Sequence, residues 1–240
     1  MLDMLKPVKT RSLKEVCAHR LEEWILSGVL GVGQKLPPER ELAQKLGVSR
    51  PVVHEALVDI AAKGLVSLIP RVGTVVNDYR REGSIALLTS LLTYHQGRLA
   101  PKLLDGLLAM RILFEVENAR LAALNRTQEQ LRSLREIILA EEAADPGDID
   151  RLTRLDFDFH HLIAMATDNQ SYPLLLNSFK PVYTNLSGQF FREPGVVPIV
   201  IAGHHELLDA LAERNQQQAM AAMRRLLEHG EERLRVIITR

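Results

Sequence analysis

Two polar side chains four residues apart have the chemistry of a metal site. Asp156 and His160 occur in the run Asp156-Phe157-Asp158-Phe159-His160-His161. On a helix, residues four apart project from the same face, so a carboxylate oxygen and an imidazole nitrogen could ligate one cation. The same spacing also suits a surface salt bridge or a helix cap, and the pair alone leaves that alternative open.

A second group of polar residues has the chemistry of DNA contact. Ser49, Arg50 and His54 share one side of a short expected helix whose other side is apolar. Arg40 precedes this helix and is placed to clamp a phosphate, while Arg71 at an expected hairpin tip could enter a minor groove. Each arginine alone is typical of a solvated surface charge. The four basic side chains together predict DNA binding.

Charge is unevenly distributed along the chain. The 240 residues contain 30 Lys and Arg and 30 Asp and Glu, so the net charge is zero. Residues 1–80 hold 12 basic and 9 acidic side chains, a net charge of +3, and residues 81–240 hold 18 and 21, a net charge of −3. A basic beginning and an acidic remainder favour a DNA-reading domain followed by one that does not adhere to DNA.

Composition excludes several classes of protein. The single cysteine, Cys17, permits neither an intrachain disulfide nor a cysteine-based zinc cluster. No apolar run approaches the ~20 residues of a membrane span, and the first residues are not typical of a secretory signal. We therefore expect a cytoplasmic protein without membrane contact.

Three helices and a hairpin are expected to position the DNA-contacting residues. Ser12 can cap a first helix, a pair of prolines leads into a second that ends at Gly47, and Ser49 caps a third. Two β-branched segments flank a basic, glycine-containing tip and predict a hairpin. Three residues join the second and third helices, so residues 1–80 are predicted to form a winged helix-turn-helix.

From about residue 84 the pattern is helical throughout. Amphipathic segments alternate with breakers such as Pro101 and Pro146-Gly147. They cover residues 84–98, 101–125, 127–144, 148–168, 171–192, 196–213 and 215–238. The chain is therefore predicted to be mainly α. Residues 81–100 would connect the winged helix to an antiparallel bundle of six or seven helices over 101–240.

An ordered set of motifs resembles a known family. The set comprises Gly33-Gln34-Lys35-Leu36-Pro37-Pro38-Glu39-Arg40-Glu41-Leu42-Ala43, Leu46-Gly47-Val48-Ser49-Arg50-Pro51-Val52-Val53-His54-Glu55-Ala56-Leu57, Gly64-Leu65-Val66 and Gly73-Thr74-Val75-Val76. These runs resemble the winged helix of GntR-family bacterial transcription regulators. The helical remainder is similar to the FCD-like effector domain of the FadR-type subfamily, so the resemblance covers nearly the whole chain.

The resemblance implies particular DNA contacts. Arg40, Arg50 and position 54 would touch DNA, with the wing from Arg71 to Gly73 in the minor groove. We expect Lys35 to be a further phosphate contact. Position 54 usually carries arginine in this family, but here it is His54. Because imidazole cannot form the bidentate fork of a guanidinium, we expect a shifted operator preference or pH-sensitive binding.

The resemblance also implies a metal site with one ligand missing. Metal-binding FadR-type domains add to Asp156 and His160 a histidine that matches His204, with His205 as the neighbouring alternative. The fourth position falls at Leu226, which cannot bind a cation, and His229 lies about 4.5 Å further along the helix axis. Two outcomes stay open. Either a three-ligand site for Zn or a similar divalent metal persists, or the cation is lost and the pocket binds its ligand directly.

Two further residues are expected at the effector pocket. By the same resemblance Arg111 faces the pocket, where its guanidinium could pair with an effector carboxylate. An internal ion pair with Glu115 is the alternative. Tyr183 lies on a helix that would form a pocket wall, so the expected effector-binding set is Arg111, Asp156, His160, Tyr183 and His204.

These observations predict a ligand-responsive transcriptional regulator. We expect a homodimer that binds a pseudo-palindromic double-stranded operator, and repression that a small carboxylate relieves. A metal-free sensor of acyl-CoA in the same family is the alternative. A metal-dependent hydrolase is a remote alternative, because the sequence lacks a nucleophile elbow and a phosphate-binding glycine loop. We therefore expect no enzymatic activity.

Overall fold

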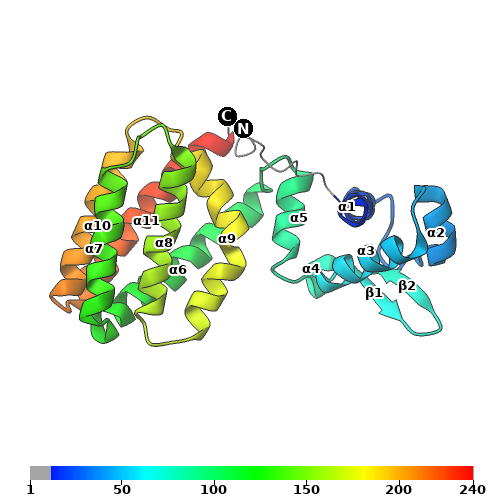
Figure 1. The fold of residues 1–240 in the computed structure, drawn as a ribbon, viewed down its shortest axis with the longest axis horizontal. Coiled ribbons are helices and arrows are strands. Elements are labelled where there is room, and N and C mark those ends of the chain that lie inside the picture. The colour runs from blue at the N-terminus through cyan, green and yellow to red at the C-terminus, as the bar shows by residue number, and fades with distance from the viewer. Residues whose placement is uncertain (1–11, 240) are drawn as a thin grey trace, which may run out of the picture. The chain divides into compact units, whose positions relative to one another are not determined.

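The computed structural model describes residues 12–239. The chain forms two compact units, and the boundary between them along the sequence falls between Gly97 and Arg98. The N-terminal unit holds short helices and one hairpin, and the C-terminal unit is entirely helical (Figure 1). The prediction of a mainly α chain with a winged helix and a helical bundle is confirmed.

The N-terminal unit is built from five helices and two strands among the described residues. The elements are α1 (Leu13–Leu26), α2 (Glu39–Leu46), α3 (Arg50–Ala62), β1 (Val66–Ile69), β2 (Gly73–Val76), α4 (Tyr79–Glu82) and α5 (Leu87–Tyr94). The sequence patterns did not indicate α4. The segment 81–100, expected to be a connector, contributes α5, which packs against α1 within this unit.

Local sequence sets most of these helix ends. Ser12 and Glu15 form a reciprocal capping box at the start of α1, and Gly47 ends α2 in the left-handed conformation. Ser49 occupies the N-cap position of α3, but its side chain makes no capping hydrogen bond. Pro51 supplies no N–H at one of the two positions that a capping hydroxyl uses, so the expectation that Ser49 caps through its side chain is wrong.

The hairpin forms the wing. β1 and β2 pair antiparallel with Val66 opposite Val76 and Ile69 opposite Gly73. Arg71 at the tip has a φ of 64°, and Gly73 has a φ of 114°. The φ of Gly73 is one that L side chains rarely adopt, so this strand end favours glycine, and a Cβ there would also lie 3.2 Å from Cε of Lys35.

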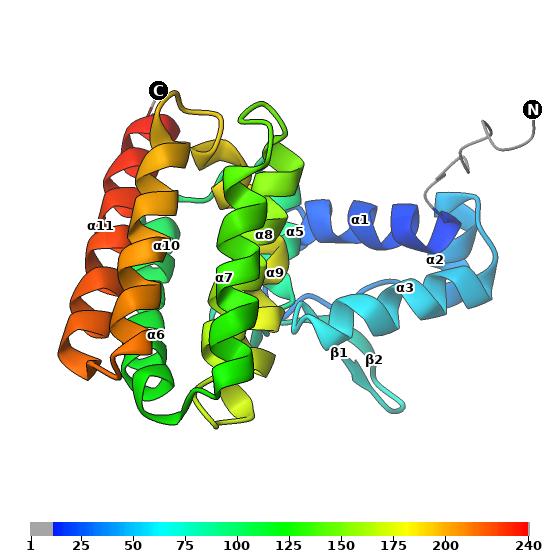
Figure 2. The same cartoon turned by 60° about the vertical axis from the view of Figure 1, so that its left-hand side comes forward.

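The C-terminal unit contains six helices among the described residues. They are α6 (Pro101–Asn125), α7 (Gln128–Glu142), α8 (Ile149–Met165), α9 (Ser171–Phe190), α10 (Val196–Ala212) and α11 (Gln216–Thr239). α6 packs along α11, α8 packs along α9, and α7 lies between α8 and α10 (Figures 1 and 2). None of the described helices is long and apolar enough to cross a membrane.

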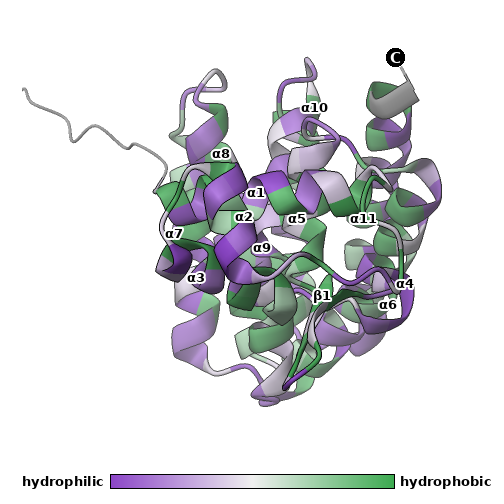
Figure 3. Cartoon of the chain, turned by 90° about the vertical axis from the view of Figure 1, so that its right-hand side faces the viewer, coloured by the Kyte–Doolittle hydropathy of each residue, from purple (hydrophilic) through white to green (hydrophobic). Residues whose placement is uncertain are grey.

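Amphipathic helices supply the core of each unit. Figure 3 shows hydrophobic and hydrophilic residues on each helix of the bundle. Small side chains such as Ala119 and Ala122 on α6 allow close approach, while Phe159 and Leu207 fill the space between α8 and α10. The polar side chains that are buried in this unit therefore stand out against an apolar core.

Candidate DNA interface and candidate effector site

The expected DNA-contacting residues of α3 are exposed and share one acidic partner. Arg50 and His54 lie one turn apart, with 73% and 57% of their side chains exposed. Arg50 Nε donates to Glu39 Oε2 at 2.9 Å, and His54 Nδ1 lies 2.7 Å from Glu39 Oε1. Because a carboxylate only accepts hydrogen bonds, His54 Nδ1 carries the proton here. Glu39 therefore orients both side chains.

Sequence reasoning did not assign a role to Glu39. It lies 11 residues before Arg50, and only the packing of α2 against α3 brings the two together. The hydrogen bond from His54, followed by that from Arg50, lowers the pKa of Glu39 below its ordinary value. The glutamate therefore stays ionised beside the two side chains that are expected to contact DNA.

A cleft of about 470 Å³ separates the start of α2 from the wing. Lys35, Arg40, Arg50, Arg71 and Gly73 all contribute to its lining. Arg40 and Arg71 have no ion-pair partner among residues 12–239. The structure thus brings the expected phosphate and wing contacts to one cleft, with His54 and Ser49 outside its lining.

In the C-terminal unit, three expected metal ligands meet in the core. Asp156 and His160 lie on α8 and His204 lies on α10, and one donor atom from each falls within 4.8 Å of the others. All three side chains are buried. His205 instead lies at the surface, where its Nε2 is 2.8 Å from Oε1 of Glu142. Packing therefore selects His204 over its neighbour.

Carboxylates outside this trio orient both imidazoles. His204 Nδ1 lies 2.8 Å from Glu141 Oε2, and His160 Nδ1 contacts Glu115. In both rings Nε2 turns toward Oδ1 of Asp156, at 3.9 Å for His160 and 3.8 Å for His204. A neutral imidazole that donates through Nδ1 presents a lone pair at Nε2, which is how histidine ligates metals with carboxylate support.

The donor trio leaves a buried nitrogen without a hydrogen-bond partner. Nε2 of His204 is buried and has no hydrogen-bond partner. Oδ2 of Asp156 already accepts from Tyr183 Oη at 2.8 Å and from Ser187 Oγ at 3.4 Å, so its Oδ1 is the oxygen that faces the two rings. Three electron-pair donors therefore converge on one point, and this arrangement fits a cation.

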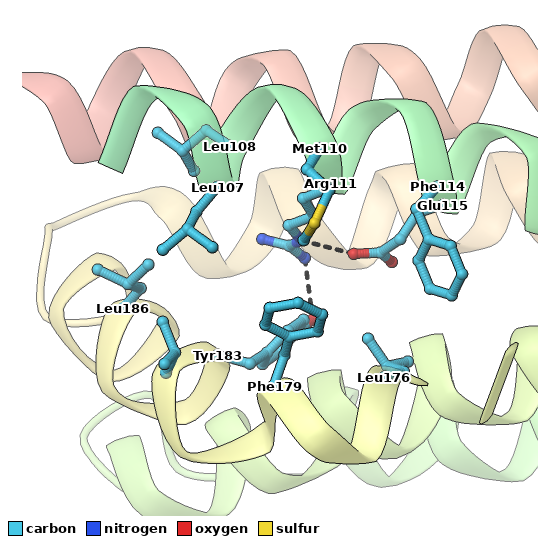
Figure 4. Close-up of a pocket in the computed structure, with 11 residues that line it drawn as sticks. Leu107, Leu108, Met110, Arg111, Phe114, Glu115, Leu176, Phe179, Tyr183 and Leu186 are labelled. Carbon is cyan, nitrogen blue, oxygen red and sulfur yellow. Dashed lines mark hydrogen bonds and ion pairs between the residues drawn. The ribbon is translucent and has the colours of Figure 1, made fainter. Parts of the chain in front are cut away.

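Arg111 belongs to the same polar network. Its Nε donates to Glu115 Oε1 at 2.6 Å, and its Nη2 donates to Tyr183 Oη at 3.0 Å (Figure 4). Since Tyr183 contacts Asp156 and Glu115 contacts His160, the side chains form a closed ring. The alternative of an internal Arg111–Glu115 pair is thus realised in this structure.

Burial and charge shift the pKa values of this ring. Burial alone would raise the pKa of Glu115, but its contacts with His160 and with the Arg111 guanidinium outweigh burial and lower the value to about 2. Burial raises the pKa of Tyr183 well above its ordinary value, so its hydroxyl stays protonated and donates to Asp156.

Leu226, the position that the family resemblance gives for a fourth ligand, lies close to the donor trio. It lines a cavity of about 20 Å³ together with Arg111, Asp156 and His160. A Cβ on Gly203 would lie 2.8 Å from Leu226 Cδ1, so glycine at this point of α10 makes room for the leucine. His229 lies outside the donor trio, near the ring of Phe190 with a centroid separation of 6.2 Å.

Glu141 is a further residue that sequence reasoning missed. No local spacing connects it to His204, 63 residues away, and it reaches the site because α7 packs against α10. The only sequence signal is an acidic residue at an otherwise apolar position of an amphipathic helix.

A winged helix joined to a separate helical domain is the architecture of a DNA-binding regulatory protein. Residues 13–76 match the family described as bacterial regulatory proteins, gntR family, and residues 106–229 match the FCD domain. The chain belongs to the GntR family of DNA-binding transcriptional regulators, in the group that carries an FCD domain. The family is one of regulators, not enzymes.

Curated relatives match over most of their length. The chain is 30% identical to the HTH-type transcriptional regulator Mce2R of Mycobacterium tuberculosis, covering 93% of this chain and 92% of the relative. It is also 30% identical to the Glc operon transcriptional activator of Escherichia coli strain K12, covering 89% and 85%. The solved structure of Lar from Listeria monocytogenes is 18% identical and covers 95% and 99%, and its TM-score of 0.64 shows a shared fold.

Proposed function

We propose that this regulator senses a small carboxylate in its helical unit with the help of a divalent cation held by Asp156, His160 and His204. One observation carries the proposal: three buried donors converge while the outer nitrogens of both histidines contact carboxylates. When bound, the cation would supply positive charge and open positions for effector oxygens. Because Leu226 has no donor atom, the cation would have no fourth protein ligand on the side of the cavity that Leu226 lines.

Charge balance in the cluster around Asp156 supports the cation. Glu115, Glu141 and Asp156 are all buried, whereas Arg111 is the cationic side chain among them. With both histidines neutral, two negative charges lack compensation, and uncompensated buried charge costs several kcal/mol. A divalent cation would neutralise them.

Titration with Zn²⁺ tests the metal site. Isothermal titration of dialysed full-length protein should show one site per chain, and His204→Ala should abolish it. His205→Ala is the matched control, because this neighbour is exposed and pairs with Glu142. Equal binding by both variants would refute the proposed ligand set.

For the DNA-binding unit, the proposed function is repression at a pseudo-palindromic operator by a homodimer. The proposed contacts are Lys35, Arg40, Ser49, Arg50, His54, Arg71 and Gly73. One winged helix reads one half-site, so two-fold symmetry supplies the second. A preference of the effector for one arrangement of the helices would shift operator affinity by a coupling of ~1–3 kcal/mol.

Salt dependence tests the phosphate contacts. Binding to DNA from upstream of the protein's own gene can be measured by fluorescence anisotropy at several salt concentrations. Arg40→Ala should reduce the log–log slope by about 0.9 for each phosphate that the arginine neutralises. Arg224→Ala, which removes an exposed arginine of α11, is the control. An unchanged slope for Arg40→Ala would contradict the assignment.

A further inference from the structure

A polar hollow lies between α8 and α9, outside the donor cluster. The two helices pack side by side, and residues three and four apart on each of them line the hollow (Figure 1). The lining includes Asp150, Thr153 and Arg154 of α8, Asn185 and Gly188 of α9, and Arg192 after the end of α9. The hollow shares no residue with the donor trio.

Two arginines give the hollow a net positive charge. Arg154 and Arg192 are both exposed, and neither has an ion-pair partner among the residues that the structure describes. Asp150 precedes Arg154 by four residues, a spacing that suits an ion pair on a helix, yet the two side chains do not pair. Residues 81–240 hold 18 basic and 21 acidic side chains, a net charge of −3. The hollow is therefore a positive site on an acidic part of the chain.

Thr153 contributes a buried hydroxyl without a partner. Only 6% of the residue is exposed, and its Oγ1 makes no hydrogen bond. A threonine inside a helix commonly donates to the carbonyl one turn earlier, as Thr184 donates to Lys180 at 2.9 Å. A Cβ on Gly188 would contact Oγ1 of Thr153 at 3.9 Å, so glycine leaves this side of the hydroxyl uncovered. Because a buried hydroxyl without a partner is costly, its place in the hollow indicates a ligand that accepts a hydrogen bond.

Asn185 adds an amide donor to the hollow. Its Oδ1 accepts from Gln189 Nε2 at 2.8 Å, so its Nδ2 is left to donate. The lining thus offers two guanidiniums, one hydroxyl and one amide N–H. These donors outnumber the two oxygens of a carboxylate and match a tetrahedral oxyanion, which has three or more acceptor oxygens.

We propose that the hollow binds a phosphate group, carried by a small phosphomonoester or present as free inorganic phosphate. Arg154 and Arg192 pair with its charge, while Thr153 Oγ1 and Asn185 Nδ2 donate to its oxygens. The site lies apart from the proposed metal and carboxylate site and gives the regulator a second small-molecule ligand.

The surroundings favour a small ligand over the backbone of a DNA duplex. The hydroxyl of Thr153 is buried, so its acceptor must enter the space between the two helices. The acidic part of the chain around the hollow also repels an extended polyanion more strongly than a single phosphate group.

Calorimetry with two phosphate ligands tests the site. Full-length protein, freed of metal with a chelator, is titrated with inorganic phosphate and with glycerol phosphate at constant ionic strength. One ligand should bind per chain, and Arg154→Ala and Arg192→Ala should each weaken binding at least about tenfold. Thr153→Val keeps the shape of the side chain without the hydroxyl and should weaken binding about fivefold. Asp150→Asn should strengthen binding about two- to fivefold, because it removes the opposing negative charge.

Two further variants serve as controls. Arg151→Ala is the matched one, because this arginine is exposed on the same helix and does not line the hollow. His204→Ala removes a proposed metal ligand and should leave phosphate binding unchanged. Thermal denaturation verifies that all variants fold.

The outcomes identify the source of the phosphate group or overturn the inference. Tighter binding of glycerol phosphate supports a phosphorylated metabolite, and equal binding of both ligands supports recognition of phosphate alone. Absence of saturable binding, equal weakening by Arg151→Ala, or loss of binding in His204→Ala would overturn the site. If neither ligand binds while Arg154→Ala and Arg192→Ala weaken operator affinity, the arginines contact DNA and the inference is likewise wrong.

Discussion

The carboxylate of Glu39 lies 2.7 Å from Nδ1 of His54, so an acid of the second helix holds a side chain of the third that we expect to contact DNA. The same carboxylate accepts a hydrogen bond from Arg50. In DNA recognition, such an acid orients its partners and also opposes contact with phosphate. We therefore expect Glu39 to favour contacts with base edges, which require oriented side chains, over contacts with phosphate, which require only positive charge.

Glu39→Gln should make DNA binding less specific. Loss of the negative charge should strengthen binding to random DNA by about two- to fivefold, because attraction to phosphate increases. The ratio of operator to random affinity should fall about tenfold as Arg50 and His54 lose their orientation. Anisotropy titrations with operator and scrambled duplexes measure both. A preserved ratio would show that Glu39 does not orient the readout.

The pKa of Glu39 should depend on His54. The contact holds the pKa of Glu39 below its ordinary value. The ionised carboxylate therefore stabilises the folded protein fully at pH values above the unfolded carboxyl pKa of ~4.3. This stabilisation is lost as the pH falls through the lower pKa of Glu39 in the folded protein. In a carbon-detected NMR titration, His54→Ala should raise the pKa of Glu39 toward its ordinary value. Lys45→Ala, which removes a cation paired with Glu41 on the same helix, should have no such effect.

Glu141→Gln should weaken Zn²⁺ binding about 10- to 100-fold. The substitution keeps the shape of the side chain but removes the carboxylate that contacts Nδ1 of His204 and orients its ring. Glu142→Gln tests the neighbouring, exposed carboxylate, which contacts His205, and should bind Zn²⁺ as the wild type does. Isothermal titration distinguishes the two, and equal affinities would exclude an orienting role for Glu141.

Leu226→His should supply a fourth donor. Leu226 lines the cavity that contains Asp156 and His160, and Gly203 leaves room beside it. We expect Zn²⁺ affinity to rise at least tenfold, since a further neutral imidazole completes a four-coordinate site. Leu226→Phe adds a ring of similar shape without a donor nitrogen and should give no gain. A similar affinity in both variants would place position 226 away from the metal.

Lys63→Met should destabilise the N-terminal unit by about 2–3 kcal/mol. Lys63 Nζ contacts Glu22 at 2.5 Å and Ser90 at 3.0 Å, and both partners are buried. Removal of the amine leaves the Glu22 carboxylate unpaired in a buried position.

Fluorescence isolates this effect, because the only tryptophan, Trp24, packs against the core of the N-terminal unit. Urea unfolding followed at Trp24 should show the reduced stability of Lys63→Met. The matched control is Lys14→Met, whose exposed pair with Asp59 should contribute nothing measurable. Equal midpoints for the two variants would contradict the prediction.

Local patterns in the sequence determined the elements and the residue types of both sites. Amphipathic periodicity and breakers depend only on neighbouring residues, so the expected helices of the bundle agree with α6 to α11 within a few residues at each end. The pairing of Asp156 with His160 is local for the same reason. The assignment of Leu226 to a fourth ligand position came from the resemblance to the FCD domain. The expectation that Arg50 and His54 contact DNA came from their place on the third helix together with the resemblance to the GntR winged helix.

Only tertiary packing decided which side chains complete those sites. Glu39 meets His54, Glu141 meets His204 and Tyr183 meets Asp156 across 15, 63 and 27 residues of sequence. It also decided that His204 and not His205 enters the core, and that Arg111 contacts Tyr183 beside the donor cluster. Burial against another helix sets these contacts, and a linear pattern does not specify which helix faces will meet.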